Sequence, residues 1–365
     1  MANVATVKFL GAFDKMRKPL MFLSSFFKTE RRDYFNSTSV EIHVRRHGQR
    51  VAVALQGMTS DPRWSDVDKH SVKVMTPYSY NEGFEVNGAD VMNAGFGKTQ
   101  YDEPSYMRDA LLSFADNGVE KEYAIQRAVE LQTSEILQTG TVTLIDSNGD
   151  TIGALDFKPK ATHFPQVSVS WATIATATPL ADMESLADVI RKDSGVFPSI
   201  AIMGGTAFGY ALQTTEFQNA LDNRRMNLGI IMPSEINSDG AKYQGDVHLG
   251  SYRVEIWTYP ESYDHIQTSV DTPYIALNNV VMLSPKSQFK LAYGGFPSPL
   301  AKPDPRVSTF LNVLPRRVSR PGFVDLNPIV WCSEDGQSIK GAVRSRPLAY
   351  PVGIDEYGCI NTVQA

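Results

Sequence analysis

The sequence has 365 residues, of which 42% are hydrophobic and 21% are charged, and this balance excludes a largely disordered chain. The length suits about two domains with a sizeable core. A formal net charge of -5 argues against a general nucleic-acid binder, which would be basic, but it is compatible with a protein that merely encloses nucleic acid.

The cysteine count and the hydropathy pattern exclude further classes. Cys332 and Cys359 are the only cysteines, so neither a disulfide framework nor a four-cysteine zinc site is expected, and a reducing compartment is favoured. No apolar run approaches the roughly 18 residues that cross a membrane. The apolar patch that follows Lys15, Arg17 and Lys18 lacks a small-residue cleavage pattern, and we interpret it as mature protein.

The chain begins with an arm that contains a compact apolar patch. Phe22, Leu23, Phe26 and Phe27 follow Pro19, a good first-turn residue, and predict a short amphipathic helix. Such a short helix is marginal alone, so these side chains must be buried on their own domain or on a neighbouring subunit. Because the patch is flanked by basic residues, we expect the second alternative and interpret the arm as an assembly element.

Strand patterns and a long polar connection come next. Alternation over residues 38–56 predicts a hairpin, and residues 57–78 form a connection that includes Trp64 and Lys69 and ends in a strand-like stretch. Connections of this length are usually functional or are supported by something else. Residues 79–103 are glycine-rich, and we expect them to be irregular.

The strongest helix signal spans residues 117–140, after a short helix over 104–116. Asn117 is predicted to cap it and Gly140 to end it. Gln132 and Glu135 interrupt its apolar stripe, either as locally satisfied side chains or as contacts with another element or subunit. The residues expected on the opposite face are Glu122, Arg127 and Glu130.

The second half alternates helices with strands. Residues 141–157 predict a hairpin with its turn at 147–150. The composition then changes between 161 and 179, which we take as a domain boundary. The elements expected beyond it are helices over 182–192 and 206–221, strands over 200–203, 254–257, 275–283, 342–344 and 347–352, and a stiff proline-rich loop over 296–305.

No residue pattern specifies catalysis, a metal site or a cofactor. Gly95, Gly97 and Lys98 lack the glycine that a phosphate loop needs five positions before Gly97. Gly204 and Gly205 favour a plain strand-to-helix turn, because the rest of a dinucleotide fingerprint is missing. His43 and His47 flank a strand and its turn and would lie too far apart to bind one metal ion. The cluster of Arg316, Arg317 and Arg320 is a solvated surface or, alternatively, an intersubunit or DNA-facing patch.

Six segments, in this order, resemble the major capsid proteins of tailed bacteriophages in the lambda capsid protein family. They are PLMFLSSFF (19–27), EYAIQRAVELQTSEILQTG (122–140), SIAIMGGTAFGYALQTTEFQNALDNRR (199–225), YQGDVHLGSYRVEIWTY (243–259), PYIALNNVVML (273–283) and SRPLAYPVGIDEYG (345–358). Each piece alone is a weak signal, whereas their shared order is specific.

The resemblance implies an α+β chain with the Hong Kong 97-type capsid fold. The implied parts are an N-terminal arm (1–35), an extended loop (56–78), a peripheral domain with a long spine helix (36–55, 79–178 and 325–365) and an axial domain (179–324). Because the chain starts directly at the arm, a separate scaffolding protein is expected. Crosslinking through Lys69 or Lys73 in or beside the loop is not expected.

The resemblance also implies a function. We expect a structural subunit of an icosahedral phage head, which forms hexamers and pentamers around packaged double-stranded DNA and is assembled in the host cytoplasm with a portal protein and a decoration protein. The alternatives are an encapsulin-like nanocompartment shell and, disfavoured by the lack of a converging polar site, a soluble enzyme. Candidate intersubunit contacts are Phe22, Leu23, Phe26, Phe27, Trp64, Lys69, Gln132 and Glu135.

Overall fold

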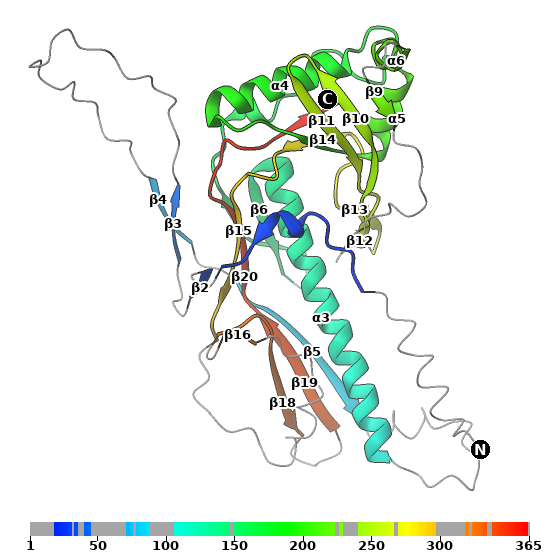
Figure 1. Ribbon diagram of the computed structural model, residues 1–365. Coiled ribbons are helices and arrows are strands. Elements are labelled where there is room, and N and C mark those ends of the chain that lie inside the picture. The colour runs from blue at the N-terminus through cyan, green and yellow to red at the C-terminus, as the bar shows by residue number, and fades with distance from the viewer. Residues whose placement is uncertain are drawn as a thin grey trace, which may run out of the picture.

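The protein has two lobes joined by one long helix (Figure 1). The computed structural model describes residues 18–30, 33–35, 40–44, 71–75, 78–87, 106–146, 149–222, 226–228, 240–265, 269–296, 318–320, 323–333 and 338–363. Predictions that lie outside these residues include Trp64, Lys69, the strand at 51–55, the Gly95–Thr99 loop, Arg316, Arg317 and most of the proline-rich loop.

The joining helix, α3 (Tyr106–Thr139), is one continuous element of 34 residues, or about 50 Å. The predicted break at Asn117 is therefore wrong. The side chain of Asn117 donates to the carbonyl of Ser113, 2.8 Å away and one turn earlier, instead of capping a new helix. The predicted end is confirmed, because Gly140 has a φ of 71° and its amide donates to Ile136 at 2.8 Å.

A three-stranded antiparallel sheet covers the N-terminal half of α3 and forms the lower lobe. It consists of β18 (Asn327–Cys332), β19 (Ser338–Ser345) and β5 (Tyr80–Asn87), in that order. The expectation of irregular structure is wrong for β5. Its alternate residues Phe84 and Val86 pack around buried Phe114 of the helix, so tertiary packing outweighs the local glycines.

A second small sheet places the arm beside α3. β15 (Phe289–Gly294) pairs antiparallel with β20 (Pro347–Pro351), and its other edge pairs in parallel with two short arm strands, β1 (Phe27–Lys28) and β2 (Tyr34–Phe35). After α3, the hairpin of β6 (Thr141–Ile145) and β7 (Thr151–Asp156) is present as predicted, with Gly149 in its turn at a φ of 84°.

The upper lobe is a six-stranded sheet with helices on one face (Figure 1). Its strand order is β21 (Gly358–Asn361), β14 (Asn279–Leu283), β8 (Ile200–Met203), β11 (Tyr252–Thr258), β10 (Lys242–Leu249) and β9 (Met226–Leu228). Ala201, Met203 and Val254 pack against the helices, whereas Ile200 and Ile202 join the core shared with α3. The sheet therefore separates two hydrophobic cores.

The helices of this lobe differ in part from the sequence prediction. α4 (Pro179–Ser194) begins earlier than expected, with proline in its first turn, and ends at Gly195 as predicted. The single helix predicted over 206–221 is two helices, α5 (Gly205–Gln213) and α6 (Thr215–Asp222). Buried Thr214 adopts an extended conformation between them, and its hydroxyl donates to Ala211 at 2.7 Å, which ends α5.

Three two-stranded ribbons complete the described strands. They are β3 (Val40–Val44) with β4 (Ser71–Met75), β12 (Ser262–Asp264) with β13 (Asp271–Pro273), and β16 (Val318–Arg320) with β17 (Phe323–Val324). β3 was predicted to pair within residues 38–56, but its partner in the described part of the chain lies on the far side of residues 45–70.

The strand pairing crosses the expected domain boundaries at two places. β21 lies in the range expected for the peripheral domain but pairs with β14 in the upper sheet. β15 lies in the range expected for the axial domain but pairs with β20 below it. The boundaries therefore remain proposals.

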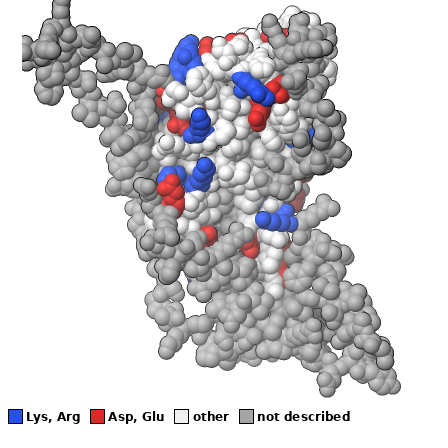
Figure 2. Space-filling view, in the orientation of Figure 1, with Lys and Arg blue, Asp and Glu red and all other residues white. Residues whose placement is uncertain are grey.

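On the face seen in Figure 2, Lys and Arg side chains are interspersed with Asp and Glu rather than gathered in one block. None of the described helices has both the length and the apolar character that crossing a membrane requires.

Candidate assembly interface: the arm and its socket

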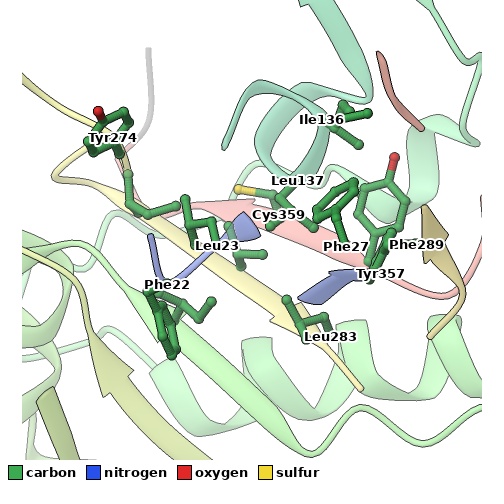
Figure 3. Close-up of a cluster of buried hydrophobic side chains, with 14 of the residues drawn as sticks. Phe22, Leu23, Phe27, Ile136, Leu137, Tyr274, Leu283, Phe289, Tyr357 and Cys359 are labelled. Atoms are coloured by element: carbon green, nitrogen blue, oxygen red, sulfur yellow. The ribbon is translucent and has the colours of Figure 1, made fainter. Parts of the chain in front are cut away.

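The described part of the arm, residues 18–30 and 33–35, packs into a socket made by Glu130 of α3, Trp257 and Tyr259 at the end of β11, and Phe289 of β15. The Phe22 ring lies 5.7 Å from that of Trp257 and 5.6 Å from that of Tyr259, between ring centroids. Phe27 stacks on Phe289 at 4.9 Å. Figure 3 shows Leu23 and Phe27 within the same apolar cluster as Phe289 and residues from the C-terminal strands.

These contacts correct the prediction that the arm's patch is held by a neighbouring subunit. Phe22, Leu23 and Phe27 are only 5%, 0% and 5% exposed within their own chain. The amphipathic helix is also wrong, because the segment forms a single 3-10 turn, η1 (Ser24–Phe26). Burying each large apolar side chain contributes about 1.5–3 kcal/mol, so the arm belongs to the subunit's core. Phe26 is half-buried and remains a candidate contact.

A buried carboxylate holds the turn in place. Glu130 has no exposed surface, and its two oxygens accept the amides of Leu23 at 2.7 Å and Ser24 at 3.0 Å. The hydroxyl of Tyr259 lies 3.0 Å from Glu130 Oε1. Burial raises the pKa of Glu130, and these hydrogen bonds reduce the rise without cancelling it. Glu130 thus acts as an external cap for the arm's turn.

Polar contacts also fasten the strand part of the arm. The hydroxyl of Thr29 donates to the carbonyl of Leu291 at 2.9 Å, between the two parallel pairings with β15. The ammonium group of Lys290 lies 3.3 Å from a carboxylate oxygen of buried Asp33. The arm is therefore attached along its whole described length rather than at one point.

The polar residues in the helix stripe are also used inside the subunit. Gln132 donates to the hydroxyl of Tyr80 at 2.7 Å and is 5% exposed, which matches the predicted contact with another element, while its role as an intersubunit contact stays a prediction. Its partner is another element of the same chain. Glu135 accepts the amide of Thr143 at 2.6 Å and is partly exposed, so it stays a candidate.

The C-terminal turn of α3 is tied to the upper sheet. Gln138 donates to the carbonyl of Tyr274 at 2.8 Å and accepts the amide of Ala276 at 2.9 Å. The hydroxyl of Ser134 donates to the same Tyr274 carbonyl. The backbone groups of Tyr274 and Ala276 lie just before β14, so the helix and the upper lobe are joined by hydrogen bonds as well as by the core.

Two features could support chemistry elsewhere among the described residues: the glycine turn at Gly204 and Gly205, and a group of metal-binding side chains. The amide of Ala207 at the start of α5 donates to the carbonyl of Leu277 at 2.9 Å, so that amide of the glycine turn is used within the fold. No group of three or more His, Cys, Asp or Glu in the described part of the chain is placed to hold a metal ion.

The family model described as phage major capsid protein E matches residues 9–356. The chain belongs to the phage major capsid protein E family. It is a structural subunit of a phage head shell, is found in the virion, and assembles with copies of itself. No curated protein sequence matches the chain.

A solved structure shares the fold of this capsid protein. The putative capsid protein of an E. coli CFT073 prophage has a TM-score of 0.59 at 14% identity, covering 100% of this chain and 99% of that one. Looser matches are Gordonia phage Cozz (TM-score 0.49, 9% identity, 96% and 89% covered) and the holo-SrpI encapsulin of Synechococcus elongatus PCC 7942 (0.44, 8%, 100% and 96%). The fold is the Hong Kong 97-type capsid fold, as predicted.

The sequence prediction missed Glu130. It assigned Glu122 and Glu130 to the face opposite the apolar stripe, yet they are 6% and 0% exposed. The partners of Glu130 at Leu23 and Tyr259 are 107 and 129 positions away. A helical period cannot reveal partners so distant in sequence. The only indication in the sequence was the arm, whose apolar side chains had to be buried against some other part of the protein.

Proposed function

We propose that this capsid protein closes an icosahedral head as hexamers and pentamers, and that the β3–β4 ribbon is a principal contact between subunits. Among the described strands, β3 and β4 pair only with each other, and Figure 1 shows the ribbon projecting from the body of the protein. A hairpin of two strands is marginally stable by itself in water. A neighbouring subunit in the shell supplies the missing support.

We also propose a role for each part of the chain in the shell. Residues 56–78 act as the extended loop, so Trp64 and Lys69 contact neighbours, and Phe26 and Glu135 add smaller contacts. Residues 1–35 form the arm, residues 179–324 the axial domain, and the remaining ranges the peripheral domain. Symmetric repetition multiplies each modest contact over many subunits.

The shell encloses double-stranded DNA without reading its sequence. A net charge of -5 supports this, because a strongly basic inner wall would hold the packaged DNA through its phosphates. We propose that the protein is not an enzyme, and that a separate scaffolding protein, a portal protein and a decoration protein take part. Assembly takes place in the host cytoplasm.

Replacing residues 45–70 with a short Gly-Ser turn tests the proposal. The variant subunit is expected to keep its fold by circular dichroism but to sediment as small species, whereas the wild type with its scaffolding protein forms closed shells by electron microscopy. A Lys192→Gln variant, altered at an exposed position of α4, serves as the control and should assemble normally. Normal shells from the loop replacement would refute the role of the ribbon.

A further inference from the structure

The hydroxyl of Tyr259 lies between two oxygens that accept hydrogen bonds. It is 2.9 Å from the carbonyl oxygen of Leu20 in the arm and 3.0 Å from Oε1 of Glu130. A tyrosine has one hydroxyl hydrogen, and neither a carbonyl nor an ionised carboxylate can donate. If Glu130 were ionised, one of these two contacts would therefore bring acceptors together without a hydrogen.

A proton on Glu130 satisfies all of these atoms. Oε1 of Glu130 then donates to Tyr259, and Tyr259 donates onward to the carbonyl of Leu20. The amides of Leu23 and Ser24 still have acceptors, because a protonated carboxyl group keeps lone pairs on both oxygens. The result is a short chain of hydrogen bonds that runs from Glu130 in α3 through Tyr259, just after β11, to Leu20 in the arm.

The surroundings favour this protonated state. Glu130 is 0% and Tyr259 is 2% exposed, and burial raises the pKa of both groups. The other ionisable groups that act on the buried tyrosines Tyr259 and Tyr274 are Glu261, Tyr263 and Arg127. Arg127 is exposed, and no cation is hydrogen-bonded to Glu130 in the described part of the chain.

We propose that Glu130 carries a proton while the arm is docked, so that the arm is held by a pH-dependent latch that tightens in acid and loosens in base. The docked state binds one more proton than the released state, in which water reaches the carboxyl group. Docking is then strongest below the ordinary pKa of a glutamate and weakens as the pH rises through the raised value. This property belongs to the single subunit and is independent of shell formation.

Two measurements on the full-length subunit test the latch. Infrared spectroscopy at neutral pH should show the band of a protonated carboxyl group, and Glu130→Gln should remove it. Hydrogen exchange of residues 18–28, corrected for the intrinsic effect of pH, should speed up by at least about tenfold between the ordinary pKa of a glutamate, about 4.3, and mildly alkaline conditions. Glu130→Gln should abolish that dependence, because its amide both donates and accepts without titrating.

Glu122→Gln is the matched control, since Glu122 is a buried residue of the same helix whose carboxyl group accepts a hydrogen bond from Gln126 at 2.8 Å, and it should retain the wild-type band and pH dependence. A pH-independent arm in the wild type, or a folded Glu130→Gln subunit whose arm is released at every pH, would overturn the proposal. If Glu130→Gln does not fold, wild-type protein with isotope-labelled glutamate decides the question. A shifted protonated band supports the latch, and its absence refutes it.

Discussion

His163, in the segment that follows β7, meets Asp193 at the end of α4, with Nε2 of the imidazole 3.0 Å from a carboxylate oxygen. The other ring nitrogen, Nδ1, lies 2.8 Å from the carbonyl oxygen of Tyr357. Both neighbours are acceptors, so the geometry matches an imidazolium that donates from both nitrogens. Lys160 adds a second cation 2.6 Å from Asp193. Three segments, at the end of β7, at the end of α4 and just before β21, are fastened by this group.

Removing the imidazole should therefore weaken the junction. His163 is fully buried, and His163→Ala is expected to lower the free energy of unfolding by about 2–3 kcal/mol, because it removes charge-assisted hydrogen bonds and leaves the Tyr357 carbonyl without its donor. Denaturant unfolding of the subunit measures the loss. His248→Ala, at an exposed position of β10, should stay within about 0.5 kcal/mol of the wild type. Equal losses in the two variants would contradict the assigned role.

The same cluster predicts an effect of acid. Burial raises the pKa of Asp193, but hydrogen bonds and charge from Lys160 and His163 outweigh it, so the net pKa is lowered. A lowered pKa in the folded state stabilises the protein above the ordinary value of about 3.9, and this stabilisation is lost as the pH falls through the lower value. Asp193→Asn should flatten the decline of the melting temperature in that acidic range. An unchanged decline would show that other carboxylates dominate.

Two adjacent glycines give an internally controlled test of packing. A Cβ at Gly204 would lie 2.3 Å from the carbonyl oxygen of Ala276 and 2.4 Å from that of Leu277, both of which are backbone atoms. Gly204→Ala should cost more than about 2 kcal/mol, because the backbone there cannot move aside. A Cβ at Gly205 meets nothing within 4 Å, so Gly205→Ala should be neutral or stabilising by up to about 1 kcal/mol. Thermal melting of both variants checks the contrast, which a similar loss in each would refute.

The arm should matter for the fold as well as for assembly. Phe22→Ala is expected to cost about 3 kcal/mol, because it leaves a cavity against Trp257 and Tyr259. Phe26→Ala should cost clearly less, since Phe26 is partly exposed already. Urea unfolding compares the two, and deletion of residues 1–30 should give an unstable or aggregated subunit. A stable, soluble deletion variant would restore the view of the arm as a pure assembly element.

The two cysteines should react at different rates. Cys359 is 4% exposed, and burial raises the pKa of its thiol to about 12, so little thiolate is present at neutral pH. Cys332 is partly exposed on the edge strand β18. A thiol reagent should label Cys332 in the folded protein and both residues in guanidinium, as mass spectrometry of peptides can measure. Labelling of folded Cys359 as fast as Cys332 would contradict its burial.

The sequence predicted helix ends and turns correctly where the backbone conformation of a single residue determines them. Gly140 and Gly195 end helices because a left-handed residue there is easiest for glycine, and the turn at Gly149 follows the same rule. The fold itself followed from the order of several resembling segments. The break at Thr214 has a local cause, the hydrogen bond from its hydroxyl to Ala211, which the helical period of residues 206–221 does not reveal. The strand β5 was not predictable, because its packing on Phe114 decides it. The same limit hid the arm's socket, whose members come from three distant parts of the chain.

The position of the arm in the chain also bears on how the protein is made. Leu291, whose carbonyl accepts the hydrogen bond from Thr29, is synthesised 262 residues after it. At roughly 5–20 residues per second, the ribosome needs about 13–50 s to cover that distance. During this time Phe22, Leu23 and Phe27 have left the ribosome without their final packing surface. The exposed apolar side chains of the nascent arm are therefore expected to bind host chaperones. If translation stops before β15, these side chains stay exposed and promote aggregation.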